Sequence, residues 1–189
     1  MRDPEIRKVL RNSILKDYLS DPNSKVVEEL RLNPASAQID IAVLNGSIHA
    51  FEIKSASDTL NRLPSQLEAY SKVCDYISIV TEVKYVKKIM AMVPDWIGVT
   101  QCDDTGCQIM RKPQRNSLIQ GFYLAQLLRI DEIKQLLVAN GVVFNHGRRK
   151  WYLSELLANS LAVQDLSNQV RLTMKSREGW KEDSLNLAH

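Results

Sequence analysis

The sequence contains little of several features that would narrow a function quickly. It has no apolar run long enough to span a membrane. It begins Met-Arg-Asp-Pro-Glu, without an apolar signal region. Only seven glycines are present in 189 residues, and none of them forms a phosphate-binding loop motif. We therefore expect a protein that does not enter membranes and works in the cytoplasm.

Cysteine and histidine are also scarce. The three cysteines, Cys74, Cys102 and Cys107, are an odd number. In a chain without a signal region we expect them to be free thiols. The three histidines are scattered. Zinc binding, Cys/His catalysis and Ser/His/Asp catalysis therefore have no supporting motif.

Charge is distributed unevenly along a chain whose composition, 44% hydrophobic and 25% charged, is ordinary for a globular protein. Residues 1–110 carry 13 Lys and Arg against 15 Asp and Glu, a balance of −2. Residues 111–189 carry 12 against 7, a balance of +5, and the two sum to the net +3 of the chain. An acidic half followed by a basic half suits an enzyme of nucleic acid with its own binding module. Random surface variation is the alternative.

Hydrophobic periodicity predicts alternating helices and strands up to residue 111. Helices are expected over residues 4–19, 64–74 and 83–93, and strands over residues 25–32, 38–44, 47–55, 76–81, 97–102 and 107–111. This order predicts an α/β fold with a mixed sheet flanked by helices.

After Pro113 the pattern becomes helical. Helices are expected over residues 117–128, 131–139, 155–161 (capped by Ser154) and 164–176. We therefore predict two domains, residues 1–113 and residues 114–189. The second is either a helix-turn-helix or winged-helix-like module or a helical cap on the sheet, and both alternatives stay open.

Two carboxylates and a lysine interrupt the apolar strands over residues 38–55. Strand alternation puts Glu52 and Lys54 on one face of the sheet. Carboxylate oxygens bind hard cations such as Mg²⁺, and a lysine beside them can orient water or offset charge on a phosphate. The alternative is a solvated sheet face, or a Lys–Glu ion pair without metal.

Asp40 can join this pair only if the connecting loop has an odd length. A two-residue turn at Asn45-Gly46 would place Asp40 on the face opposite Glu52. A three-residue loop of Leu44, Asn45 and Gly46, with Gly46 in the left-handed conformation, would pair Val43 with Ser47 and place Asp40 on the same face as Glu52. The chemistry therefore predicts an odd loop or a bulge here.

The pattern Asp40…Glu52-Ile53-Lys54 resembles that of the PD-(D/E)xK superfamily, the restriction-endonuclease-like nucleases. The expected order of elements from residue 4 to about residue 81 also resembles the α-β-β-β-α-β core of that superfamily. Ile39 stands where the superfamily name has proline, a proline that its members often lack. The resemblance implies that Asp40 and Glu52 bind Mg²⁺ or Mn²⁺ and that Lys54 assists the attacking water.

A second element of the resemblance lies on the next helix. Gln66-Leu-Glu-Ala-Tyr70 matches the Gln-x-x-x-Tyr motif of the RecB-like branch, and at i,i+4 the two side chains share a helix face. The stretch from Phe51 to Gln66 also resembles a group of bacterial proteins with this signature. The resemblance implies that Gln66 and Tyr70 support the catalytic site.

Less specific patterns suggest a third metal ligand and the residues that contact nucleic acid. The superfamily often adds an acid from a preceding helix or strand, which makes Glu29 the candidate third metal ligand, with Glu28 as the alternative. The residues expected to contact nucleic acid are basic residues in loops: Arg62, Arg148, Arg149 and Lys150.

The sequence thus predicts a Mg²⁺-dependent endo- or exodeoxyribonuclease that hydrolyses phosphodiester bonds, with RNA as the alternative substrate. Two other functions stay open. One is a catalytically silent nucleic-acid-binding module on the same fold. The other is a protein-interaction component, in which the C-terminal helices bind a partner protein or form a homodimer.

Overall fold

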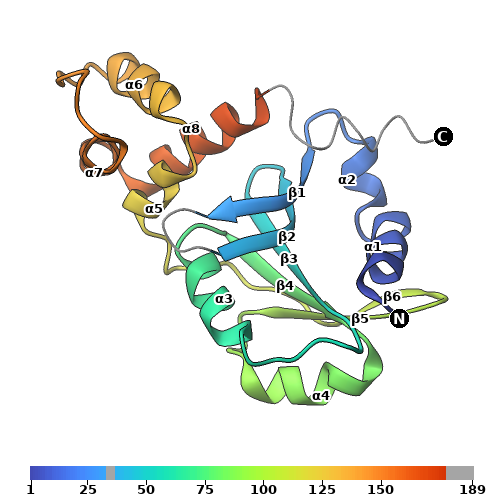
Figure 1. Ribbon diagram of the computed structural model, residues 1–189. Coiled ribbons are helices and arrows are strands. Elements are labelled where there is room, and N and C mark those ends of the chain that lie inside the picture. Colours follow the sequence, from blue (N-terminus) through green and yellow to red (C-terminus); the bar gives the residue numbers. More distant parts are fainter. Residues whose placement is uncertain (33–36, 178–189) are drawn as a thin grey trace.

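The structure is a computed structural model and describes residues 1–32 and 37–177 (Figure 1). Its helices are α1 (Asp3–Asn12), α2 (Lys16–Ser20), α3 (Leu63–Ser71), α4 (Val83–Met92), α5 (Gly121–Gln126), α6 (Ile130–Ala139), α7 (Lys150–Ser160) and α8 (Val163–Lys175). Its strands are β1 (Lys25–Leu32), β2 (Ala37–Leu44), β3 (Ile48–Lys54), β4 (Tyr76–Thr81), β5 (Gly98–Asp103) and β6 (Gly106–Arg111).

The six strands form one sheet in the order β1-β2-β3-β4-β5-β6. The pairs β3–β4 and β4–β5 are parallel, and the other three pairs are antiparallel. The mixed α/β sheet flanked by helices that the sequence predicted is confirmed. The order from α1 to β4 is also the expected helix, three strands, helix and strand, except that the first helix is broken.

Each face of the sheet has its own hydrophobic cluster. Ile6 and Leu10 of α1 pack with strand residues such as Phe51 and Val80 on one face. Helices α3 and α4 cover the other face (Figure 1), where Tyr70 is fully buried among aliphatic strand residues. Strand β3 therefore lies inside a three-layer sandwich, and any polar side chain on it must find partners there.

The C-terminal helices belong to the same hydrophobic cluster as α3 and α4. Leu124 of α5, Leu157 of α7 and Val170 of α8 are buried in it. The segment before α5 is tied to the turn after α3, because the Asn116 side chain donates to the carbonyls of Ser71 and Cys74 at 2.6 and 2.8 Å. This packing agrees with the helical-cap alternative. The division at residue 113 stays a prediction.

Three helical segments differ from the sequence prediction. The first helix is interrupted between Asn12 and Lys16, so α1 and α2 are separate. The helix expected to begin at residue 117 begins at Gly121, because the preceding backbone bonds to α3 and its turn. Ser154 does not cap a helix. It lies buried inside α7, which begins at Lys150.

The expectation of three free thiols is wrong for two of them. Cys102 and Cys107 are directly opposite in the β5–β6 hairpin, with their Cα atoms 4.1 Å apart, and the structure joins them in a disulfide. Hairpin pairing at this distance brings the sulfurs together, a consequence that residue counting did not capture. Cys74 is a free, buried cysteine as expected.

Within residues 1–32 and 37–177, none of the helices has the length and apolar character needed to cross a membrane.

Candidate active site at the end of the β2–β3 hairpin

The β2–β3 hairpin has the odd loop that the acid–lysine pattern required. Leu44 pairs with Ile48, which leaves Asn45, Gly46 and Ser47 as a three-residue loop. Gly46 has φ of 63°, in the left-handed region that glycine tolerates without steric cost. The expected loop, Leu44 to Gly46 with Val43 paired to Ser47, is therefore wrong in its bounds. Val43 pairs with His49, a register shift of two residues that leaves the faces of the strands unchanged. The pairing ends at Ile41 and Phe51, and Asp40 and Glu52 are the next residues along their strands.

The strands become irregular where the site begins. Glu29 has φ of 53°, and the β1–β2 pairing skips Glu29 and Asp40. On both sides of Asp40, Ile39 and Ala42 lie in the same hydrophobic cluster, whereas regular alternation would separate them. Asp40 therefore occupies a switch point between the two faces. Its Oδ2 accepts a hydrogen bond from the main-chain N–H of Ile53 at 2.8 Å.

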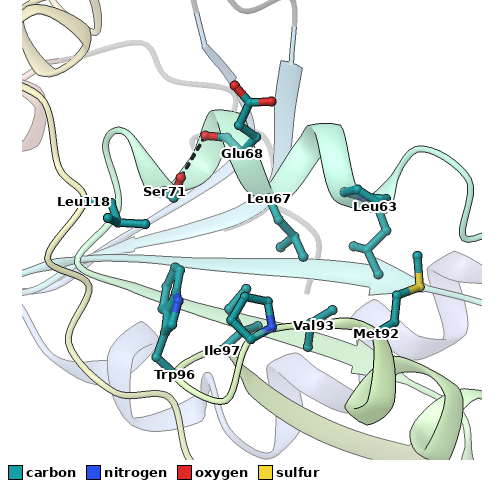
Figure 2. Close-up of a pocket in the computed structure, with 11 residues that line it drawn as sticks. Leu63, Leu67, Glu68, Ser71, Met92, Val93, Trp96, Ile97 and Leu118 are labelled. Atoms are coloured by element: carbon teal, nitrogen blue, oxygen red, sulfur yellow. Dashed lines mark hydrogen bonds between the residues drawn. The ribbon is translucent and has the colours of Figure 1, made fainter.

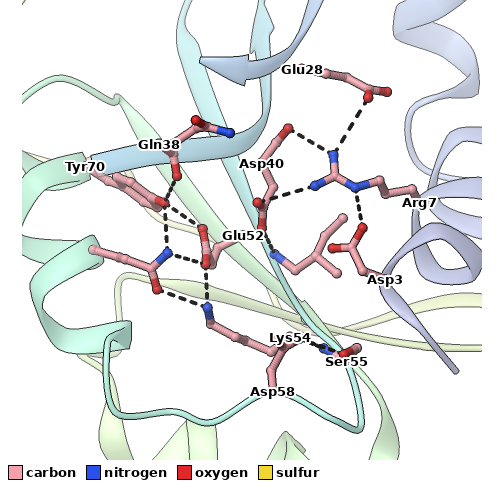
Figure 3. Close-up of polar contacts among 12 residues, drawn as sticks. Asp3, Arg7, Glu28, Gln38, Asp40, Glu52, Lys54, Ser55, Asp58 and Tyr70 are labelled. Carbon is pink, nitrogen blue, oxygen red and sulfur yellow. Dashed lines mark hydrogen bonds and ion pairs between the residues drawn. The ribbon is translucent and has the colours of Figure 1, made fainter. Parts of the chain in front are cut away.

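Glu52 is the centre of a buried polar cluster formed with Lys54, Gln66 and Tyr70 (Figure 3). Only 1% of Glu52 is exposed, and Oε1 accepts from Lys54 Nζ at 2.6 Å and from Gln66 Nε2 at 2.7 Å. Gln66 Oε1 in turn accepts from Lys54 Nζ at 3.0 Å. The amide of Gln66 thus holds the carboxylate and the ammonium together.

Tyr70 closes the cluster from the other side of Glu52. Its hydroxyl lies 2.6 Å from Glu52 Oε2 and also contacts the main-chain carbonyl of Gln38. Burial first, and then the charge of Glu52, raise the pKa of Tyr70. The phenol is therefore a neutral hydrogen-bond donor at any physiological pH.

Asp40 is held in an electrostatically unfavourable place. Burial, followed by repulsion from Glu52, raises the pKa of Asp40 from 3.8 to about 6. Arg7 of α1 partly offsets this, since its Nη2 lies 3.4 Å from Asp40 Oδ1 and its Nη1 donates to the Asp40 carbonyl at 3.2 Å. Perturbed carboxylates of this kind are concentrated at functional sites.

The two candidates for a third metal ligand, Glu28 and Glu29, have different surroundings. Glu28 faces α1 and accepts from Arg11 at 2.8 Å, and its other oxygen lies 3.8 Å from Arg7 (Figure 3). Arg7 therefore links Glu28 to Asp40. Glu29 is exposed, at the positive-φ position. Glu28 therefore belongs to a contact network that reaches Asp40 through Arg7.

The basic residues predicted to contact nucleic acid lie in separate places. Arg62 is exposed at the N-cap of α3, one turn before Gln66. Arg148, Arg149 and Lys150 lie far along the chain, at the start of α7. Arg62 thus lies on the same helix as Gln66 of the polar cluster, whereas the other three residues belong to the C-terminal helices.

Arg7 and Gln38 are functional candidates that the sequence interpretation missed. Asp3 accepts from Arg7 Nε at 2.6 Å, so α1 fixes the guanidinium before it reaches Asp40. The i,i+4 spacing of Asp3 and Arg7 on a helix was the available signal. It did not point to Asp40, because that contact spans 33 residues and depends on the tertiary fold.

The residues present fit a hard divalent cation. Asp40 and Glu52 supply carboxylate oxygens from adjacent strands, and their mutual repulsion is what such a cation would relieve. Among the described residues, no cluster of three or more His, Cys, Asp or Glu side chains is arranged for a metal ion. Two protein carboxylates suit Mg²⁺, which usually keeps several water ligands.

A pocket of about 270 Å³ lies on another face of α3, towards the α4–β5 connection (Figure 2). Its lining is mostly apolar, with Leu63, Leu67 and Trp96 among the contributors, and Glu68 is its only titratable side chain. The pocket lacks a paired acid and base. The buried polar cluster, and not this pocket, therefore carries the candidate chemistry.

Comparisons with known proteins give one family. The family model described as Bacteriophage P4 protein cII matches residues 1–188. Protein cII of Enterobacteria phage P4 is 30% identical over 183 residues, which cover 94% of this chain and 68% of that protein. A solved structure of a protein of unknown function from Silicibacter pomeroyi matches with a TM-score of 0.48 and 13% identity, covering 76% of this chain and 92% of that one.

Proposed function

The chain belongs to the Bacteriophage P4 protein cII family, and from the geometry of its polar cluster we propose that it is a metal-dependent nuclease that hydrolyses phosphodiester bonds in DNA. One observation carries this proposal: the buried contacts of Glu52 with Lys54, Gln66 and Tyr70, beside an Asp40 carboxylate that the charge of Glu52 repels. The proposed substrate is DNA, and the proposed location of the protein is the cytoplasm.

The proposed roles follow from the contacts. Asp40 and Glu52 would hold Mg²⁺ or Mn²⁺, which when bound would polarise the phosphate and lower the pKa of an attacking water. Lys54 Nζ supplies a fixed positive charge beside them and offsets negative charge that develops on the phosphate. Gln66 and Tyr70 fix the rotamers of Lys54 and Glu52, so the charged groups need little reorganisation during the reaction.

Burying the charges of this cluster costs free energy of folding, and a function would explain why the protein keeps them. Buried ion pairs seldom stabilise a protein more than apolar residues of the same volume would. Here Glu52 and Lys54 occupy a strand that otherwise buries Ala50, Phe51 and Ile53. A catalytic site accounts for charges in such a place, where a simple structural role does not require them.

The test is cleavage of supercoiled plasmid and of single-stranded DNA by the purified full chain with Mg²⁺ or Mn²⁺. Lys54→Ala and Glu52→Gln should each lower the rate by about 100-fold or more, the range typical of losing a catalytic group. The controls are exposed residues of the same charge, Lys88→Ala and Asp104→Asn, and these variants should cut at the wild-type rate. If the wild type binds DNA without cutting it under any metal condition, the silent binding module is the better description.

A further inference from the structure

A second surface, remote in sequence from the polar cluster, combines exposed aromatic rings with exposed positive charge. We call Arg148, Arg149, Trp151 and Tyr152 the aromatic–basic patch. They lie at the end of the α6–α7 loop and the start of α7, at the outer edge of the C-terminal helices (Figure 1). Trp151 is 55% exposed and Tyr152 is 37% exposed, although large aromatic side chains are usually well buried.

Three side chains of the patch are in contact: Arg148 with Tyr152, and Tyr152 with Trp151. The guanidinium carbon of Arg148 lies 5.0 Å from the centre of the Tyr152 ring. The rings of Tyr152 and Trp151 pack edge to face, with centroids 6.1 Å apart. The Tyr152 ring therefore links the indole of Trp151 to the cation of Arg148, and the cation–π contact limits the freedom of Arg148.

The charge on the patch and on the chain before it is positive. Residues 133–154 contain Lys134, Arg148, Arg149 and Lys150 and no Asp or Glu, and the first acid after them is the exposed Glu155, one turn further along α7. Lys150 points inward, where its Nζ donates to the carbonyl of Gln126 at 2.8 Å. Arg148 and Arg149 are exposed. The surface offered to a partner is thus aromatic and cationic, and its complement is a polyanion that carries flat rings.

We propose that the aromatic–basic patch binds single-stranded nucleic acid, with an unpaired base stacked on Trp151 and phosphates contacting Arg148 and Arg149. Paired bases in a duplex are already stacked on their neighbours, so an exposed indole can stack only on a base that is free. The inference rests on the proposed nuclease function, for which it names the substrate class: DNA with a single-stranded segment.

The test is binding of a fluorescent oligodeoxythymidine of about 20 nucleotides to the full chain, followed by anisotropy in EDTA so that no cleavage intervenes. Trp151→Ala should weaken binding about 10-fold, the effect of losing one stacked base. Trp151→Phe should retain most of the affinity. Leu172→Ala, at an equally exposed apolar residue of α8, should leave it unchanged. Because both positions are exposed, each of the three variants should fold, which circular dichroism verifies.

Salt dependence tests the arginines separately. Each arginine that contacts a phosphate contributes about 0.7 to the slope of log affinity against log salt concentration for single strands. Arg148→Ala and Arg149→Ala should each reduce the slope by about that amount. Lys87→Ala, an exposed lysine of α4, should not. The same measurement with a blunt duplex should give weaker binding that Trp151→Ala does not alter.

The outcomes separate this inference from the proposed function. Equal affinity of wild type and Trp151→Ala for the oligonucleotide overturns the inference, and so does an absence of DNA binding, even if the protein cleaves DNA through Glu52 and Lys54. Loss of oligonucleotide binding in Trp151→Ala supports it even if no metal condition yields cleavage. In that case the nuclease proposal fails and a single-strand-binding function remains.

Discussion

At the scale of single residues, the site is a set of charges held where they are individually unfavourable. Glu52 and Lys54 form an ion pair at 2.6 Å, so each buried charge is balanced by the other. Asp40 has a weaker partner, since its contact with Arg7 is 3.4 Å, and its carboxylate also faces the charge of Glu52. A protein that keeps such a residue gives up folding stability at the site.

This unfavourable charge predicts that Asp40→Asn stabilises the metal-free protein. The folded pKa of Asp40, about 6, exceeds the ordinary 3.8, so between these values the folded state binds the proton more tightly. The contribution of Asp40 to the free energy of unfolding therefore falls as pH rises through this window. Above pH 6 the destabilisation by the ionised Asp40 reaches its full value. The asparagine can still accept from the Ile53 N–H.

Thermal unfolding in EDTA measures this effect. Asp40→Asn should be more stable than the wild type at pH 7.5 by roughly 1–3 kcal/mol, with the difference shrinking towards pH 4. Asp104→Asn, at an exposed loop position, serves as the control and should show no such pH dependence. A variant less stable than the wild type at pH 7.5 would mean that the contact with Arg7 outweighs burial and repulsion.

Much of the site's residue composition was predictable from the sequence, but its contacts were not. Alternation and motif spacing singled out Glu52, Lys54, Gln66 and Tyr70, which the structure places in one cluster; their catalytic roles stay predictions. Arg7 was not identified, because a contact between α1 and β2 depends on how the first helix packs. The disulfide was missed for a similar reason, since pairing required the hairpin register.

At the scale of elements, the β2–β3 hairpin decides which residues share a face. Its three-residue loop sets the register, and a change of one residue would turn Glu52 and Lys54 to the opposite face. Strand alternation was sufficient to predict an odd loop. It did not predict the break at Glu29 and Asp40, where the faces switch, since no turn residue marks that position in the sequence.

Gly46→Ala tests the loop geometry. An alanine at φ of 63° should lower the free energy of unfolding by about 1 kcal/mol, although a Cβ there would touch nothing within 4 Å. Urea denaturation measures the difference. Gly147→Ala is the matched control, because Gly147 lies in an exposed loop without a positive φ, and it should cost less. Equal costs at the two positions would show that backbone strain does not distinguish Gly46.

At the scale of the whole molecule, one hydrophobic cluster joins the sheet to the C-terminal helices. Buried side chains from α5, α6, α7 and α8 complete the face on which Tyr70 lies. The change of pattern after Pro113 was visible in the sequence. Whether the later helices stand apart or pack on the sheet was not, because apolar helix faces do not specify their partners.

The joined core predicts that residues 1–113 do not fold alone. Removing α5–α8 would expose the apolar side chains that now bury Leu124, Leu157 and Val170, so the shortened chain should aggregate or lack a cooperative unfolding transition. Near-ultraviolet circular dichroism and thermal unfolding of the fragment give the measurement. A cooperative transition with the stability of the full chain would instead support two independent domains.

The measurement that tests the central proposal most directly is cleavage of supercoiled plasmid by the wild type and by Asp40→Asn, each with Mg²⁺ and with EDTA. The wild type should cut with Mg²⁺ and not with EDTA, and Asp40→Asn should cut about 100-fold more slowly while remaining folded and at least as stable. A folded Asp40→Asn protein that cuts as fast as the wild type, or wild-type cutting that EDTA does not stop, would contradict a metal-dependent site at Asp40 and Glu52.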